Sequence, residues 1–373
     1  MSGNELRRVR ITAVHMPRLE WAVGREVSLP SAMLGSAAGS PGVTSLDLRV
    51  IPPPSLNGLA EDLRLRAAFT TQPPVSKKLP FNYQRVPPLL RWYIARHIGR
   101  RLRARRAEWS RYPDWPLDLS ADFVNDWMCG DELLPSSSCA PVLQTHDIES
   151  REGLRNLVEM FLPVEEAAGA RSTSYVVPAG WPLDHGLLRE VIARGHDIGV
   201  HGYDHSNRTA FLDAEERHRR LTAGRQALAM YSPQGYRAPS LVRTAPLIDD
   251  LGRYYRYDSS IPTSGGPFPV FNNGCASVRP FRIGRTLEIP ITMWRDGSVR
   301  FLGYQPSDIG EMWEQNARAV AAARGVVMLL THCERRFSGN PEMLDAYRRF
   351  VDFVRTSPAF EWSTPARIAA AVR

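Results

Sequence analysis

Short apolar runs alternate with amphipathic stretches along the last two thirds of the chain. Four of these runs predict buried strands: Ala140–Thr145, Ser172–Val177, Asp197–Val200 and Gly325–Thr331. The segment Asp184–Gly195 predicts a helix, because Leu188 and Val191 share its apolar face, Asp184 can cap its start and Gly195 can end it. Strands that alternate with helices predict a largely parallel sheet and an α/β fold.

The first 135 residues have a different and less regular pattern. The stretches "RVRITAV" and "SLDLRVI" alternate apolar and polar residues as half-buried strands do. From Leu89 to Trp109 the pattern becomes helical, with an apolar stripe that recurs every four residues among arginines. We therefore predict an α+β extension over residues 1–135, followed by a separate α/β domain over residues 136–373.

Composition limits the classes of protein to consider. The chain has 373 residues, of which 43% are hydrophobic and 23% charged, as in globular proteins. It lacks an apolar run of about 18 residues, and its first residues lack the apolar core of a signal peptide, so we expect a cytoplasmic protein. The four cysteines show no CxxC spacing, which disfavours a disulfide framework and a cysteine zinc site.

The net charge is +8, and it is unevenly distributed. The stretch Arg96–Arg106 contains six arginines. Such a patch can attract phosphates, nucleic acid or an anionic membrane, and it is equally typical of a solvated basic helix. We expect no nucleic-acid partner, and we treat a weak contact with an anionic membrane or a lipid-linked substrate as a hypothesis.

Histidines and carboxylates directly follow three of the predicted strands: His146, Asp147 and Glu149, then His201 and His205, and finally His332. The carboxyl ends of parallel strands meet on one face, where α/β barrels carry their chemistry. Imidazole and carboxylate are ligands of catalytic divalent ions. The HxxxH spacing alone is more typical of surface or core histidines, so the agreement among three strands is what favours a metal site.

Three nearby polar residues have ordinary structural interpretations. His196 lies at the turn before its strand, and we expect it to be structural. His146 points to the opposite side from Asp147 on an extended strand, where it either lines the site or packs. Asp204 is either a partner of the neighbouring histidines or a turn former.

Residues 136–373 resemble the polysaccharide deacetylase family, the NodB-homology domain of carbohydrate esterase family 4. Five motifs carry the resemblance, in order: "LQTHDIES", "HGYDH", "YRAPS", "YRYDSSIP" and "LLTHCE". An alternative first motif, "LSADFVNDW" with Asp122 and Asp126, precedes the expected domain and is the less favoured choice. The resemblance implies a distorted, incomplete (β/α) barrel with the α+β extension before it.

The resemblance also implies roles for the residues in these motifs. The implied metal ligands are Glu149, His201 and His205, and the implied catalytic residues are Asp147 as general base, Arg237 as its holder, His332 as general acid and Asp258 as the residue that tunes His332. Which of Asp147 and Glu149 is the acidic ligand stays open. The implied cofactor is a divalent metal ion, with zinc preferred over manganese, cobalt or iron.

The implied reaction is removal of an acetyl group from an N-acetylated saccharide or sugar precursor, for example in exopolysaccharide biosynthesis. The chain departs from the family pattern at Glu149, which replaces an aspartate, at Gly202, which replaces Ser or Thr, and at Ser240, which replaces an aromatic residue. Two alternatives remain. One is an inactive barrel that binds a glycan or lipid carrier, and the other is an esterase or C–N hydrolase that acts on a non-sugar compound.

Overall fold

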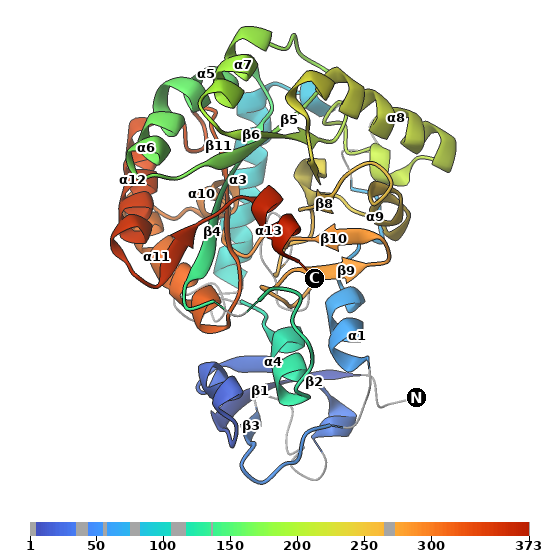
Figure 1. The fold of residues 1–373 in the computed structure, drawn as a ribbon, viewed down its shortest axis with the longest axis vertical. Helices are drawn as coiled ribbons and strands as arrows, with labels where there is room; N and C mark the ends of the chain where they lie inside the picture. Colours follow the sequence, from blue (N-terminus) through green and yellow to red (C-terminus); the bar gives the residue numbers. More distant parts are fainter. Residues whose placement is uncertain are drawn as a thin grey trace.

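The computed structural model describes residues 5–34, 44–54, 58–74, 83–105, 117–135, 137–264 and 273–372 (Figure 1). A nine-stranded sheet organises the larger part, with strand order β11-β4-β5-β6-β7-β8-β10-β9 and β12 paired with β4. Its strands are β4 (Ala140–Ile148), β5 (Ser172–Val176), β6 (Asp197–His201), β7 (Gly235–Arg237), β8 (Tyr257–Asp258), β9 (Phe281–Ile283), β10 (Thr286–Glu288), β11 (Val327–His332) and β12 (Phe360–Trp362). All neighbours run parallel except β9 and β10.

The sheet curls without closing, because its path of paired strands begins at β11 and ends at β9 in the described residues. This is the incomplete (β/α) barrel that the sequence predicts. The predicted strands are confirmed as β4, β5, β6 and β11. The remaining strands are only two or three residues long, which is too short to produce a recognisable apolar pattern.

Helices flank the sheet, and the core lies between the two layers. They are α5 (Arg151–Asn156), α6 (Leu162–Ala167), α7 (His185–Ala193), α8 (Ala214–Ala227), α9 (Ala245–Leu251), α10 (Asp296–Leu302), α11 (Pro306–Ala322), α12 (Pro341–Thr356) and α13 (Pro365–Ala371). The predicted helix is α7: Asp184 Oδ1 accepts hydrogen bonds from the backbone N–H of Gly186 and Leu187, and Gly195 follows with φ +83°. Among the described residues, none of the helices combines the length and apolar content needed to cross a bilayer.

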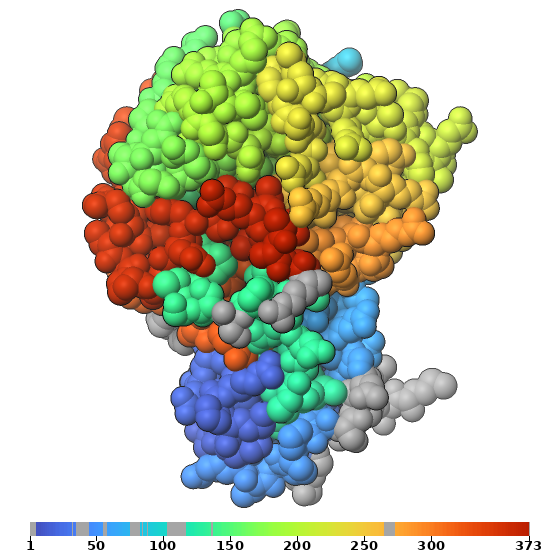
Figure 2. Space-filling model, viewed as in Figure 1, coloured from blue at the N-terminus to red at the C-terminus, as the bar shows by residue number. Residues whose placement is uncertain are grey.

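The N-terminal residues form a second lobe (Figure 2). Its small sheet has the order β2-β1-β3, with β1 (Leu6–Ala13), β2 (Glu26–Pro30) and β3 (Thr44–Asp47), and α4 (Ser120–Trp127) packs on it. This lobe has its own buried core, which includes Val9, Phe123 and Trp127. The predicted strand "RVRITAV" is confirmed as β1, whereas "SLDLRVI" is confirmed only in its first residues, because β3 ends at Asp47.

Buried charges join this lobe to the barrel. Arg279 donates to both oxygens of Asp126, at 2.7 and 2.8 Å. Asp122 accepts from the backbone N–H of Val278 at 2.7 Å and from the hydroxyl of Ser277 at 2.6 Å. Asp122 and Asp126, the alternative first motif, therefore serve the junction between the lobes and lie outside the candidate site.

Not all of the first 135 residues stay with the small lobe. The turn η4 (Tyr83–Arg85) and the helix α3 (Pro88–Arg105) lie against the barrel, and Figure 1 draws α3 in cyan behind the sheet. The ring of Trp92 on α3 contacts Phe301 and Phe337, with centroids 5.3 and 5.4 Å away. The boundary at residue 135 stays a prediction, and part of the segment before it contacts the barrel. Arg106, the end of the basic stretch, lies outside the described residues.

Candidate metal centre

The side chains expected in the site meet at the carboxyl ends of the strands. Asp147 lies near the end of β4, and His201, Arg237 and His332 end β6, β7 and β11. In the strand ladders His332 lies opposite Asp147, and His201 lies opposite Arg237. Since all four strands run parallel, one edge of the sheet gathers residues that are far apart in the sequence.

Glu149, His201 and His205 form a group that can hold a metal ion. Their ligand atoms all lie within 4.8 Å of one another. His205 Nε2 lies 2.9 Å from Glu149 Oε1, and both imidazoles are buried. Two imidazoles and one carboxylate make a donor set typical of catalytic zinc sites, which keep one position for water.

The protonation of His201 suits a metal ligand. Its Nδ1 lies 3.1 Å from the backbone oxygen of Arg237, so this nitrogen carries the hydrogen, and Nε2 is buried without a hydrogen-bond partner among the described residues. Burial lowers the pKa of His201 to about 4, although the Asp147 carboxylate opposes the shift. A neutral imidazole with an unused buried lone pair is what divalent metal binding requires, so these residues fit a divalent ion.

The turn after β6 explains why glycine replaces Ser or Thr in "HGYDH". Gly202 has φ +65°, and a Cβ there would lie 2.3 Å from Cγ of Pro239. A side chain is therefore excluded unless the turn shifts. His205 also has a positive φ, of 54°, and this conformation brings its ring within 5.1 Å of the His201 ring, between centroids.

Asp147 lies between Arg237 and His201. Its Oδ1 accepts a hydrogen bond from Arg237 Nη1 at 3.0 Å, and its Oδ2 lies 3.6 Å from His201 Nε2. Burial favours a raised pKa for Asp147, but the charge of His201, which is protonated only at the low pH where Asp147 titrates, and the charges of Arg237 and His332 outweigh it and lower the pKa below its usual value. Asp147 is therefore an ionised carboxylate with one oxygen held and the other facing the candidate metal group.

Arg237 is itself fixed by several contacts in the buried sheet. Its Nε and Nη2 donate to the backbone oxygen and the hydroxyl of Ser259, each at 3.0 Å, and its Nη1 also donates to the Thr145 hydroxyl at 3.1 Å. The guanidinium lies 4.0 Å from the centroid of the Tyr175 ring. These contacts leave the arginine one orientation, which is the one that holds Asp147.

His332 lies across the site and is paired with Asp296. Its Nδ1 lies 2.8 Å from Asp296 Oδ1, and its backbone N–H donates to Oδ2 at 2.7 Å. Burial lowers the pKa of His332, but the charge and hydrogen bond of Asp296 outweigh this effect and raise the pKa to about 9. The imidazole is thus protonated at neutral pH, and its Nε2 lies 3.9 Å from Glu149 Oε1.

The prediction that Asp258 tunes His332 is wrong, because Asp296 occupies that place. Asp258 on β8 instead lies opposite Glu288 on β10. Burial raises the pKa of both carboxyl groups, and the charge of Asp258 raises that of Glu288 further. Two buried carboxyls in contact share a proton, so Asp258 is engaged with Glu288 rather than with His332.

Sequence reasoning missed two further residues that contact the site. Asp296 lies two residues after the apolar run "EIPITMW", and a carboxylate so close to the end of such a run is a usable signal. Tyr83 comes from the irregular N-terminal part, where no pattern pointed to it. Its hydroxyl oxygen lies 2.7 Å from His205 Nδ1. The residues brought to the site thus come from six separate segments, and one of these lies before residue 135.

His146, His196 and Asp204, for which we gave structural interpretations, contact residues outside the candidate metal group. His146 lies 2.7 Å from Glu165 and packs against Phe161. His196 contacts the Ser172 hydroxyl at 2.9 Å. Asp204 accepts from the N–H and hydroxyl of Ser206, so it shapes its loop. His146 therefore packs, and the structural interpretation holds for all three.

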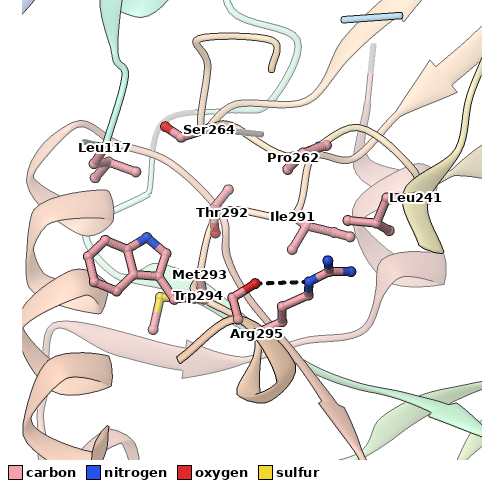
Figure 3. Close-up of a pocket in the computed structure, with 10 residues that line it drawn as sticks. Leu117, Leu241, Pro262, Ser264, Ile291, Thr292, Met293, Trp294 and Arg295 are labelled. Carbon is pink, nitrogen blue, oxygen red and sulfur yellow. Dashed lines mark hydrogen bonds between the residues drawn. The ribbon is translucent and has the colours of Figure 1, made fainter. Parts of the chain in front are cut away.

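A small pocket adjoins the site along the segment that leads into α10 (Figure 3). Its wall is mostly apolar and includes Leu241 and Trp294. Arg295 also lines it and donates from Nε to the Ser298 hydroxyl at 3.1 Å, the dashed line in Figure 3. Burial lowers the pKa of Arg295, and the charge of Asp147 opposes this shift, so the arginine lies within electrostatic reach of the site.

Comparisons with known proteins agree with this architecture. Residues 136–253 match the family model described as polysaccharide deacetylase. A Mycobacterium smegmatis protein whose structure is described as a polysaccharide deacetylase is 21% identical, with 65% of this chain and 94% of its own chain covered and a TM-score of 0.52. A similarly described Pseudomonas aeruginosa PAO1 protein is 17% identical, with 62% and 90% covered and a TM-score of 0.48.

An allantoinase, Puue, is 15% identical, with 64% of this chain and 91% of its own chain covered and a TM-score of 0.49. No curated protein sequence matches the chain. The family match confirms the resemblance to polysaccharide deacetylases, and the likeness to the M. smegmatis protein agrees with the fold.

Proposed function

We propose that this relative of the polysaccharide deacetylases is a metal-dependent hydrolase that removes the acetyl group from an N-acetylated saccharide. The proposed metal ligands are Glu149, His201 and His205, whose ligand atoms lie within 4.8 Å of one another. Two imidazoles and a carboxylate favour zinc among the divalent ions. When bound, the ion would polarise the amide carbonyl and make water acidic enough to attack near neutral pH.

Asp147 is the proposed general base. Its Oδ2 faces the proposed ligands and is available to take the proton of the attacking water, while Arg237 holds Oδ1 at 3.0 Å. The charges around Asp147 keep its pKa below the usual value, so the carboxylate is ionised before the reaction. Because Arg237 cannot rotate away from Ser259, it keeps this base aimed at one point.

His332 is the proposed general acid. Breaking the C–N bond leaves an amine that is a poor leaving group until it receives a proton. The Nε2–H of His332 donates this proton, while Nδ1–H remains bonded to Asp296. The new C–O bond comes from the water, so the products are acetate and the free amine of the saccharide.

A single observation supports this proposal most strongly. A base with one oxygen free (Asp147) and a protonated imidazole (His332) both adjoin the possible metal group. A protein that only binds a glycan has no need for an acid and a base beside a metal site. The arrangement therefore favours hydrolysis over binding.

The test measures metal content and acetate release together. The native protein should contain about one zinc ion per chain by elemental analysis, and it should release acetate from an oligosaccharide of N-acetylglucosamine. His201→Ala and His205→Ala should lose both the metal and the activity while remaining folded. His218→Ala is the matched control, since this histidine contacts Asp250 on the barrel surface away from the site and should retain both properties.

Two results would overturn the proposal. The first is full acetate release from protein that contains no stoichiometric divalent ion. The second is tight binding of the acetylated oligosaccharide, with metal present, and no release of acetate from it or from shorter acetylated sugars. The second result would support a barrel that binds glycans without hydrolysing them.

A further inference from the structure

We propose that α3 docks this protein on an anionic phospholipid surface. The site that docking would bring to the lipid is the one proposed above, but docking itself does not require catalysis. The net charge alone does not support this inference. Three observations support it: the exposed side chains of α3, the contacts of its covered face with the barrel, and the contacts between that covered face and the candidate site.

The exposed side of α3 is apolar to an unusual degree. Nine large hydrophobic side chains are exposed in the part of the chain that the structure describes, and five of them lie on this one helix. They are Leu89, Leu90, Tyr93, Ile94 and Ile98, each between 45% and 67% exposed. Single exposed apolar residues are ordinary, but a cluster on one helical face marks an interaction surface.

The opposite side of α3 already has a partner. Trp92 contacts Phe301 and Phe337, and Gly99 is buried. At 3.6 residues per turn, the covered positions fall on one side of the helix and the five exposed apolar positions fall on the other. The helix is therefore held to the barrel by one face, and its second apolar face remains exposed in the described residues.

The charges of α3 fit an anionic surface. Between Pro88 and Arg105 the sequence contains no Asp or Glu, and the exposed positions include His97, Arg100 and Arg101. Apolar side chains that enter the interface, with arginines beside them that meet lipid phosphates, are the pattern of a helix lying in the membrane plane. A second copy of this chain would offer an equally basic helix, which argues against self-association through this face.

The covered face of α3 leads directly to the candidate site. Phe337 stacks on His332, with ring centroids 4.6 Å apart, and Trp92 packs on Phe337. Tyr83, five residues before the helix begins, contacts His205. A helix bound to lipid would thus place the site close to the surface, where an acetylated saccharide carried on a lipid could reach it.

The test is co-sedimentation of the full chain with vesicles. Vesicles of phosphatidylcholine alone are compared with vesicles that also contain phosphatidylglycerol. We expect binding to the second kind only, and weaker binding as salt is added. Arg100→Gln and Arg101→Gln should each weaken it by about fivefold, and Tyr93→Ser with Ile94→Ser should reduce it at least as much.

Matched controls come from exposed residues elsewhere on the surface. Arg282→Gln and Arg285→Gln each remove the same single charge from the hairpin of β9 and β10, and Met230→Ser removes a comparably exposed apolar side chain. These variants should bind as the native protein does. Asp147→Asn should also bind normally while lacking activity, so a failure of docking is distinguishable from a failure of the proposed hydrolysis.

Three results would overturn the proposal. One is equal binding of the α3 variants and their controls to anionic vesicles. Another is equal binding of the native protein to neutral and anionic vesicles. The third is that the native protein binds neither kind of vesicle and instead forms a dimer. In this case the double variant Tyr93→Ser with Ile94→Ser would be monomeric in analytical sedimentation. This last result would make the exposed face of α3 an interface between two copies.

Discussion

Two buried pairs of arginine and aspartate lie at opposite ends of the barrel and differ in how the carboxylate is used. Near the small lobe, Arg279 binds both oxygens of Asp126, and Trp21 and Arg324 donate to the same carboxylate. At the candidate site, Arg237 binds only Oδ1 of Asp147. The Oδ2 of Asp147 is turned toward His201 at 3.6 Å.

Under the proposed mechanism, this difference separates a structural ion pair from a reactive one. A carboxylate that accepts four hydrogen bonds, as Asp126 does, has no lone pair left for a proton in transit, whereas a carboxylate held by one oxygen is both oriented and available. Asp296 lies between these cases. Both its oxygens are occupied, by His332 and Ser338 among others, so it acts on chemistry only through the imidazole that it holds.

Replacing the reactive carboxylate should have the largest effect. Asp147→Asn keeps an oxygen for Arg237 but cannot take a proton, so kcat for acetate release should fall on the order of 10²- to 10⁴-fold. The comparison is made per folded molecule, because the substitution also leaves Arg237 without its charged partner. A kcat within twofold of the native value would mean that another group is the base.

Replacing the structural carboxylate, Asp126, should lower the free energy of unfolding and leave kcat unchanged. Asp126→Asn removes the carboxylate that binds Arg279 through two hydrogen bonds and leaves Glu132, at 3.2 Å, as the remaining carboxylate partner. The free energy of unfolding should therefore fall by about 3 kcal/mol in a denaturant titration. The kcat of the folded fraction should match that of the native protein. Loss of kcat with unchanged stability would contradict the division between the two pairs.

Asp296→Asn tests the intermediate case through the pH profile. Asp296 raises the pKa of His332 to about 9, so the native acid stays protonated up to that pH and the rate should fall only above it. Without the carboxylate, a pKa near the ordinary 6.5 would leave roughly 30-fold less protonated imidazole at pH 8. The alkaline limb should therefore move to lower pH, which rate measurements from pH 5 to 10 would detect. Asp258→Asn is the control and should not move this limb.

Most of the site was predictable from the sequence, because strand ends identify it. Asp147, Glu149, His201 and His332 each end an apolar run or follow it closely, and parallel strands must bring such ends together. The order of the strands was not needed for that inference. The fold class was also predictable, because the long buried strands β4, β5, β6 and β11 appear in the sequence as apolar runs separated by helical stretches.

The errors concern contacts that no local pattern encodes. Asp258 and Asp296 both lie within two residues of an aromatic side chain, and the choice between them depends on how β8, β10 and the start of α10 are arranged in space. In the observed register of β8 and β10, Asp258 pairs with Glu288 and does not reach His332. This register cannot be read from the sequence pattern. Tyr83 is a harder case, because it reaches the site from a segment outside the family resemblance.

Tyr83→Phe should give the smallest measurable effect, and it extends the comparison to a ligand. With a metal ion bound at Nε2 of His205, Nδ1 would carry the ring hydrogen and donate it to the Tyr83 oxygen, which lies 2.7 Å away. Removing that acceptor should weaken zinc binding by about tenfold, measured by competition with a chelator, and should leave the fold intact.

Tyr254→Phe is the matched control, since this hydroxyl contacts His218 Nδ1 at 3.0 Å in a similar pair away from the site. The control should not change the zinc dissociation constant. If both variants bind zinc as the native protein does, Tyr83 only fills space beside His205. If Tyr83→Phe alone loses affinity, a residue of the N-terminal segment orients a ligand of the barrel, and the two parts of the chain form one functional unit.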